Sequence, residues 1–219
     1  MIRTSDLFNL EHTDARDYLS GFEYPWQSLR GISDFIKEAG QKLNKEEFSE
    51  IYPEVWIHKS AEISPTAYIG PPYIIGKNTH VRHGAFIRGS AFIGEGCVIG
   101  NSTEIKNSII FDYVQIPHYN YVGDSILGYK SHLGAGSVTS NIKSDKTLIK
   151  IKTAENSIET GLRKLGAIIG DLSEIGCNTV LNPGTVIGKN TTVYPLSNVR
   201  GVIKENSIYK SGSNIADKR

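Results

Sequence analysis

The sequence of 219 residues contains few cysteines, almost no net charge and no long apolar run. Two cysteines, Cys97 and Cys177, are too few for a secreted disulfide framework or a cysteine-ligated zinc site. The 24 lysine and arginine residues nearly balance the 23 aspartate and glutamate residues. The composition therefore gives no excess of positive charge that would indicate binding to nucleic acid or an anionic membrane. No segment approaches the roughly 20 apolar residues that cross a bilayer, and the N-terminus lacks a signal-peptide pattern. We therefore expect a cytoplasmic protein with reduced cysteines. A charged ligand, if there is one, would be bound by individual side chains at its site and not by the overall charge of the protein.

What the sequence does contain is a repeat of six residues. Branched apolar side chains recur at Ile57, Ile63, Ile69, Ile75, Val81, Ile87, Ile93, Ile99 and Ile105. An α-helix would need a spacing of about 3.6 residues and a plain strand would need unbroken alternation, so neither fits. A short strand followed by a corner does fit, and three such strands make one triangular coil of about 18 residues. The predicted fold is all-β: a single-stranded left-handed parallel β-helix built from hexapeptide repeats.

The repeat also divides the chain. Its spacing shortens from Ile105 to Ile110, and the pattern pauses after Leu133 and resumes at Ile169. We expect residues 55–210 to form the β-helix, 142–166 an ejected loop and 211–219 a flexible tail. Residues 1–54 do not repeat and are expected to form a short α-helical cap over the open N-terminal end of the coil, with Ser28 as a plausible helix cap. The apolar residues at helical spacing in that segment are Leu29, Ile32, Phe35, Ile36 and Leu43.

Polar side chains that break the repeat are the candidates for chemistry. Arg88 and Lys106 are 18 residues apart, so they lie one above the other, and two stacked cations favour an anion between them unless both simply face solvent. His118 follows Ile116 by two positions, outside the inward-pointing slots. An imidazole with its ordinary pKa of about 6.5 can accept a proton near neutral pH, although a lone surface histidine often has no role. Tyr121 can orient that ring or a substrate hydroxyl, or simply cover the coil surface.

A metal site is the alternative reading of the histidines. His80, His83 and His132 raise this possibility, because three imidazoles make a zinc site. Their spacing lacks the short, one-face pattern of a strong zinc motif, so no metal is expected.

The run from Ile99 to Asn141 resembles a known family. Its order GN, EIKNS, PH, YVGDS, LGAG and N is similar to the acetyltransferase domain of the bifunctional glucosamine-1-phosphate acetyltransferase/N-acetylglucosamine-1-phosphate uridyltransferases. The resemblance implies a homotrimer of left-handed β-helices that moves an acetyl group from acetyl-CoA to glucosamine 1-phosphate or a similar amino-sugar phosphate, in UDP-N-acetylglucosamine synthesis. Because a single flat coil face offers little concavity and a trimer supplies clefts, we expect the active site to lie between subunits.

The resemblance assigns roles to individual residues. It makes His118 the catalytic base, Arg88 and Lys106 the sugar-phosphate ligands, and Tyr121 and Asn141 sugar contacts. The positions implied for the acetyl-CoA site are Ala135 and Cys177. Basic residues of the loop can also contact the CoA phosphates or merely keep the loop soluble: Lys143, Lys146, Arg163 and Lys164.

Departures from the family pattern keep other functions open. Residues 1–54 contain no counterpart of the uridyltransferase domain, so nucleotidyl transfer is not expected, and His132 replaces an asparagine of the pattern. An arginine associated with the CoA phosphates is unmatched, although Arg200 or Lys210 can substitute. The rivals are a non-catalytic sugar-nucleotide-binding or regulatory trimer, a metalloenzyme of the γ-carbonic anhydrase type, and an acetyltransferase for a different sugar.

Overall fold

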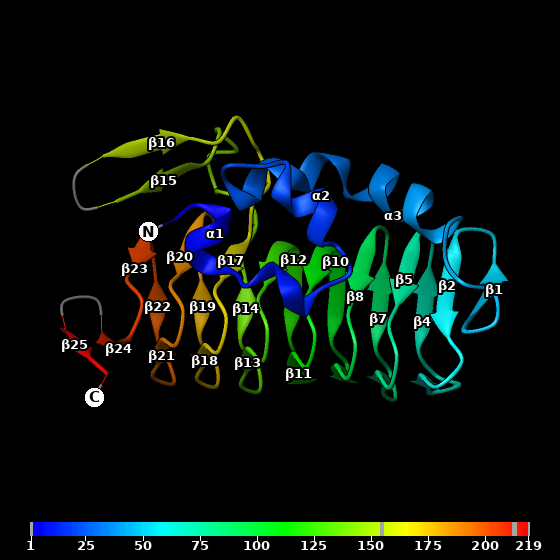
Figure 1. Cartoon of the computed structure of the whole chain (residues 1–219). Helices are drawn as coiled ribbons and strands as arrows, with labels where there is room; N and C mark the ends of the chain where they lie inside the picture. Colours follow the sequence, from blue (N-terminus) through cyan, green and yellow to red (C-terminus); the bar gives the residue numbers. More distant parts are fainter. Residues whose placement is uncertain (1, 154–155, 212–213, 219) are drawn as a thin grey trace.

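The repeat of six residues forms a three-sided coil, which confirms the predicted left-handed parallel β-helix. A computed structural model describes residues 2–153, 156–211 and 214–218 of the chain. Figure 1 shows the turns of the coil side by side along one axis. The first face consists of β2 (Val55–His58), β5 (Tyr73–Ile75), β8 (Ala91–Ile93), the second halves of β10 (Glu104–Ile110) and β12 (Tyr121–Leu127), β17 (Ala167–Ile169), β20 (Thr185–Ile187) and β23 (Val202–Ile203).

The other two faces repeat the same parallel stacking. The second face consists of β3 (Glu62–Ile63), β6 (His80–Val81), β9 (Val98–Asn101), β11 (Gln115–His118), β13 (His132–Leu133), β18 (Glu174–Ile175), β21 (Thr192–Val193) and β24 (Ser207–Ser211). The third face consists of β4 (Tyr68–Gly70), β7 (Phe86–Arg88), the first halves of β10 and β12, β14 (Val138–Thr139), β19 (Val180–Leu181) and β22 (Asn198–Val199).

The inward residues of the repeat form the core. Ile87 and Ile105 are adjacent in the pairing of β7 with β10, and both are completely buried. Full burial of each such side chain contributes on the order of 1.5–3 kcal/mol, which stabilises a fold with many turns. Ile63 and Ile69 are only partly buried, because they belong to the first turn, where the core has neighbours on one side alone.

The shortened spacing after Ile105 has a structural cause. β10 and β12 pass through a corner without interruption and so contribute to two faces each. Asn107 and Asp124 occupy this corner in adjacent turns, with φ of 47° and 49°. In the preceding turn the same corner contains two left-handed residues, Gly89 and Ser90, so the use of a single left-handed residue accounts for the shorter spacing. Asn and Asp tolerate this conformation better than most side chains.

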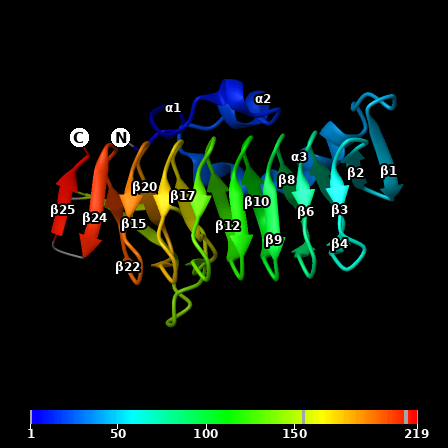
Figure 2. The ribbon, with the colours of Figure 1, turned by 90° about the horizontal axis from the view of Figure 1, so that it is seen from below.

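The N-terminal helices do not cover the end of the coil, so that prediction was wrong. α3 (Ile32–Gly40) packs on β5, β8 and β10, and η2 (Pro25–Gly31) packs on β12. The helical segment therefore lies along the first face (Figures 1 and 2). At the N-terminal end of the coil, β1 (Phe48–Tyr52) pairs antiparallel with β2 instead. Ser28 is not the helix cap, because its Oγ donates to the carbonyl of Pro25 and Gly31 precedes α3.

A short N-terminal arm, residues 2–20, runs along the edge between the first and second faces. It contains α1 (Thr4–Leu7), η1 (Leu10–His12) and α2 (Arg16–Ser20). Asp171 binds it twice: its backbone N–H donates to the carbonyl of Leu7 at 3.1 Å, and its Oδ2 accepts from the N–H of Asn9 at 2.7 Å. The His12 ring stacks on Tyr129 with 3.7 Å between ring centres. The arm is therefore attached to turns far along the coil.

Two other segments are more ordered than the sequence suggested. The insertion at 142–166 contains an antiparallel hairpin, β15 (Lys150–Lys152) with β16 (Ser157–Glu159), and its Ile149 and Ile151 are buried. The tail expected to be flexible contains β25 (Asn214–Asp217), which pairs antiparallel with β24. In the part of the chain that the structure describes, no helix is long and apolar enough to cross a membrane.

Candidate active site

The predicted stacking of Arg88 on Lys106 is present on the third face. The register of β7 with β10 pairs Ile87 with Ile105, so the next residues, Arg88 and Lys106, are neighbours. Each cation has its own carboxylate: Arg88 Nε lies 2.6 Å from Glu104 Oε1, and Lys106 Nζ lies 3.1 Å from Asp124 Oδ2. The hydrogen bond that Arg88 donates to Glu104 raises the pKa of Arg88. Carboxylates of the chain itself therefore offset the repulsion between the two cations, and an external anion is not needed for that purpose.

Asp124 connects the candidate residues, and the sequence analysis did not identify it. Its carboxylate is almost completely buried, and besides Lys106 it accepts from Asn107 Nδ2 at 2.9 Å and from Asn141 Nδ2 at 2.6 Å. Its backbone carbonyl accepts from the N–H of Gly166 at 2.8 Å, where the insertion rejoins the coil. The signal for this residue was present in the sequence, because Asp124 is the acidic residue at the corner where the spacing shortens from Val122 to Leu127.

Tyr121 and Asn141 meet at the same cluster. Asn141 Nδ2 also donates to the Tyr121 hydroxyl oxygen at 3.0 Å. Burial raises the pKa of Tyr121, and the charges of Asp124 and Glu104 raise it further. The phenol therefore stays protonated near neutral pH. Because its oxygen already accepts from Asn141, its O–H is available to donate to a ligand.

His118 lies at the last position of β11, at the corner between the second and third faces. Its side chain is exposed, and β11 pairs with β9 so that His118 lies beside Asn101. Its backbone N–H donates to Asn120 Oδ1 at 3.1 Å, and the Asn120 side chain in turn donates to the carbonyl of Gly134 at 2.8 Å. The backbone that carries the imidazole is thus fixed. Among the described residues no hydrogen bond occupies either ring nitrogen, so the ring is free to accept a proton from a ligand.

The two coil residues predicted to contact acetyl-CoA lie in line with His118. The carbonyl of His118 accepts from the N–H of Gly136 at 3.0 Å, and the carbonyl of Ala135 accepts from the N–H of Asn178 at 2.8 Å. The pairings of β11 with β13 and of β13 with β18 place His118, Ala135 and Cys177 at successive turns of one corner. Lys146 lies outside this line, on the insertion that leaves the coil after Asn141.

The cysteines and the other histidines have ordinary structural surroundings. Cys97 is fully buried, which raises the pKa of its thiol to about 12 and makes it unreactive, whereas Cys177 is exposed. His80 pairs with Glu62 at 3.1 Å and His132 with Glu174 at 2.8 Å, in separate turns. Within the described ranges, no three histidine, cysteine or acidic residues gather as metal ligands do.

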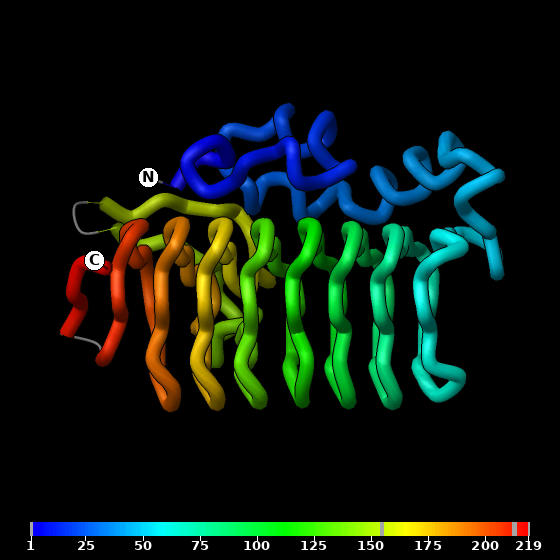
Figure 3. Tube along the Cα trace, turned by 60° about the horizontal axis from the view of Figure 1, so that its bottom comes forward, coloured from blue at the N-terminus to red at the C-terminus, as the bar shows by residue number. Residues whose placement is uncertain are grey.

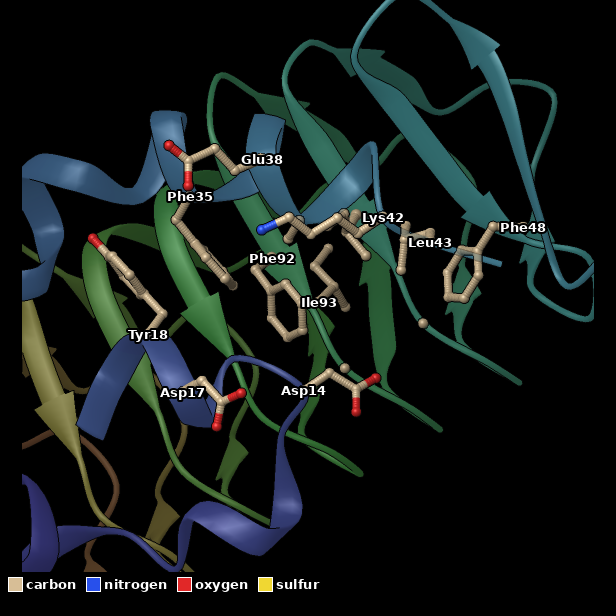
Figure 4. Close-up of a pocket in the computed structure, with 14 residues that line it drawn as sticks. Asp14, Asp17, Tyr18, Phe35, Glu38, Lys42, Leu43, Phe48, Phe92 and Ile93 are labelled. Atoms are coloured by element: carbon tan, nitrogen blue, oxygen red, sulfur yellow. The ribbon is translucent and has the colours of Figure 1, made fainter. Parts of the chain in front are cut away.

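A hollow of about 450 Å³ lies away from these residues, between the arm, α3 and β8 (Figure 4). Tyr18, Phe35 and Phe92 line it, with the carboxylates of Asp14 and Asp17 at its rim. The candidate residues instead lie on the open third face and its two corners. This placement suits a site completed by a second protomer, since one flat face encloses little volume.

Comparison with known proteins identifies relatives over most of the chain. The family model described as the GMPPB C-terminal domain matches residues 80–150. The bifunctional sugar-1-phosphate nucleotidylyltransferase/acetyltransferase of Sulfurisphaera tokodaii is 32% identical over 204 residues, 89% of this chain and 51% of that protein. The bifunctional protein GlmU of Methanococcus maripaludis is 30% identical over 213 residues, 96% of this chain and 52% of that protein. The chain thus spans about half the length of these relatives.

Among solved structures, the UDP-N-acetylglucosamine O-acyltransferase of Moraxella catarrhalis is similar with a TM-score of 0.42 and 16% identity, over 76% of this chain and 72% of that one. The curated relatives confirm the family resemblance that the motif order between Ile99 and Asn141 indicated.

Proposed function

We propose that this chain, a relative of bifunctional nucleotidylyltransferase/acetyltransferases, is an acetyl-CoA-dependent N-acetyltransferase that acts on an amino-sugar phosphate such as glucosamine 1-phosphate. The relatives support the acetyl-transfer chemistry, since the Sulfurisphaera tokodaii protein is a bifunctional sugar-1-phosphate nucleotidylyltransferase/acetyltransferase. The observation that carries the proposal is the connected cluster around Asp124, which joins Lys106, Tyr121 and Asn141 at one edge of the third face, whereas the exposed imidazole of His118 lies at the other edge of that face. The product belongs to UDP-N-acetylglucosamine synthesis.

Each residue has a step to perform. Arg88 and Lys106 bind the sugar phosphate, and the Tyr121 O–H donates to a sugar oxygen. His118 accepts the proton that the amine loses as its nitrogen bonds to the acetyl carbon, and a backbone N–H of the coil donates to the carbonyl oxygen as negative charge develops there. The carbon–sulfur bond then breaks, and the thiolate leaves and takes up a proton. General-base catalysis contributes about 10²–10⁴ in rate, and holding the two reactants together contributes the rest.

The carboxylates set the charge of this site. Arg88 and Lys106 are neutralised by Glu104 and Asp124, so the four side chains together carry no net charge. A sugar phosphate must therefore share the cations with these carboxylates. This arrangement favours reversible binding of the sugar phosphate over a permanently bound anion, because each cation is already paired with a carboxylate before the substrate binds.

A CoA-release assay with acetyl-CoA and a panel of hexosamine phosphates tests the proposal. We expect His118→Ala to lower kcat by about 10²–10⁴. The matched control is His83→Ala, which changes a histidine at the same corner two turns earlier, hydrogen-bonded to Thr66 Oγ1 at 2.7 Å, and should leave kcat unchanged. Full activity in His118→Ala would remove the proposed base. A wild-type protein inactive on every acceptor would favour a sugar-nucleotide-binding protein instead.

We further propose that the active protein is a homotrimer whose sites lie between neighbouring β-helices. The open third face, which carries the candidate residues at its edges, supports this assembly. Native mass spectrometry of the purified protein should give three times the chain mass of 24.1 kDa. A monomer that is fully active would contradict the shared site.

A further inference from the structure

The hollow between the arm, α3 and β8 has no part in the proposed reaction. Ile74 of β5 and Phe92 of β8 lie at its floor, and each is 3% exposed. Figure 3 shows the arm and the helical segment on the same side of the coil, and Figure 4 shows the hollow that they border. Its volume of about 450 Å³ lies within the range of roughly 300–1,000 Å³ in which small-molecule sites fall. The fold therefore contains a preformed space of the size that a small ligand occupies.

The apolar surface of this hollow is made of aromatic rings that hold one another in place. Tyr18 of the arm stacks on Phe35 of α3, with 4.4 Å between ring centres and 9° between ring planes. Phe35 in turn packs against Phe92, with 5.7 Å between ring centres. The Tyr18 hydroxyl donates to the carbonyl of Ser28, which fixes the ring from its polar end. The rings thus offer a rigid apolar surface to the body of a ligand.

Charges of opposite sign lie on the two sides of this aromatic floor. Figure 4 shows the ammonium of Lys42 on one side of the Phe92 ring and the carboxylates of Asp14 and Asp17 on the other. Asp17 pairs with Arg16 at 3.8 Å, and both side chains are exposed. Over residues 2–153, 156–211 and 214–218, no carboxylate lies within salt-bridge distance of Lys42, and no cation lies within that distance of Asp14. One cation and one anion therefore face the same hollow without a partner in the described chain.

We infer that this hollow binds a small zwitterion with an apolar side chain, of the amino-acid type. The ligand ammonium donates to Asp14, its carboxylate accepts from Lys42, and its side chain packs on the aromatic rings at the floor. A ligand with only an ammonium would leave Lys42 unpaired and bring a like charge towards it. A ligand with only a carboxylate would meet the carboxylates of Asp14 and Asp17. The opposite charges therefore select a ligand that carries both, and the apolar floor selects its side chain.

Calorimetric titration with phenylalanine and leucine, at neutral pH and constant ionic strength, tests the inference. The wild-type protein should bind at least one of them in a saturable manner. Two analogues of phenylalanine each lack one charge: phenethylamine has no carboxylate, and 3-phenylpropionate has no ammonium. Each should bind at least about tenfold more weakly than phenylalanine, since one charge-assisted contact is lost. An analogue that binds as tightly as phenylalanine, or no saturable binding of either amino acid, would overturn the inference.

Substitutions in the hollow test the same contacts from the side of the protein. Asp14→Asn and Lys42→Met should each weaken binding at least about tenfold. The matched control for Asp14→Asn is Glu38→Gln, because Glu38 also lines the hollow but Figure 4 shows its carboxylate pointing away from the floor. The matched control for Lys42→Met is Lys45→Met, an exposed lysine outside the hollow. Both controls should bind as the wild type does.

Two further measurements separate this site from the fold and from the proposed reaction. Without ligand, Asp14→Asn and Lys42→Met should unfold at the wild-type Tm, because neither side chain has an ion pair to lose, so weaker binding reports the site itself. His118→Ala should bind the amino acid as the wild type does, whether or not the proposed acetyl transfer is correct. Unchanged binding in both Asp14→Asn and Lys42→Met, or equal losses in the control variants, would overturn the inference.

Discussion

Replacement of Asp124 by asparagine should destabilise the fold, because this carboxylate is the common acceptor at the candidate site. Its side chain is 5% exposed, and that of Lys106 is 22% exposed. Asp124→Asn keeps the volume but removes the charge, and it turns one accepting oxygen into a donor that faces Lys106, Asn107 or Asn141. The ammonium of Lys106 is left without its partner.

The size of the effect follows from this burial. Breaking a buried ion pair by removing one partner costs about 3–5 kcal/mol, and the partial exposure of Lys106 places this case near the lower end, about 3 kcal/mol. For a chain of this length, each 1 kcal/mol lowers Tm by roughly 2–4 °C, so we expect a decrease of about 6–12 °C. Thermal unfolding followed by circular dichroism measures it.

The matched control for this variant is Asp145→Asn. Asp145 also pairs with a lysine, Lys143, but its side chain is 59% exposed on the insertion. Solvent screens that pair, so Tm should hardly change. A decrease of less than about 2 °C in Asp124→Asn, or equal decreases in both variants, would refute the idea that Asp124 holds the cluster together.

Three other predictions concern the edges and the core of the coil. Burial raises the pKa of Asp112 to about 6, the charges of Asp14 and Glu95 raise it further, and the hydrogen bond from the Glu95 N–H and the His12 ring oppose the shift. The folded state therefore binds this proton more tightly, and the free energy of unfolding of the wild type should fall as pH rises from about 4 to about 6. In urea unfolding, Asp112→Asn should lack this decrease. An identical pH profile in the variant would contradict the assignment. Gly100→Ala should lower Tm strongly, because a Cβ would overlap the backbone of the next turn. Gly89→Ala, where a Cβ would meet nothing within 4 Å but φ is 59°, should cost only about 1–2 kcal/mol. Equal effects of the two substitutions would contradict the close approach at Gly100. Ile105→Ala should cost about 2–5 kcal/mol in the same assay, and a loss below 1 kcal/mol would show that the core collapses around the cavity.

The coil was predictable because its repeat has a direct structural cause. Each turn uses the same three short strands, so the inward positions recur at fixed spacing and can be read without knowledge of distant contacts. The placement of the helical segment was not predictable in this way. The helical segment contacts β5, β8 and β12, but it does not share their six-residue repeat. The repeat therefore carries no information about which strands the helices pack on.

The candidate site was predictable in part for the same reason. Register alone identified the neighbours Arg88 and Lys106 and the exposed position of His118. The carboxylates Glu104 and Asp124 were missed, because an ion pair depends on side-chain direction. Asp124 is itself a left-handed corner residue. In the sequence this corner is visible only as a spacing that is one residue shorter.

The attachment of the N-terminal arm to Asp171 also orders events during synthesis. A stacked coil needs only the preceding turn, so its early turns can form while later residues are still being added. Asn9, however, bonds to a carboxylate 162 residues further along the chain. At about 5–20 residues per second, the arm waits roughly 8–32 s for its partner. Phe8 can pack on Phe111 earlier, but the carbonyl of Leu7, which ends up buried, also waits for the N–H of Asp171, so the start of the arm is most exposed to aggregation before residue 171 emerges.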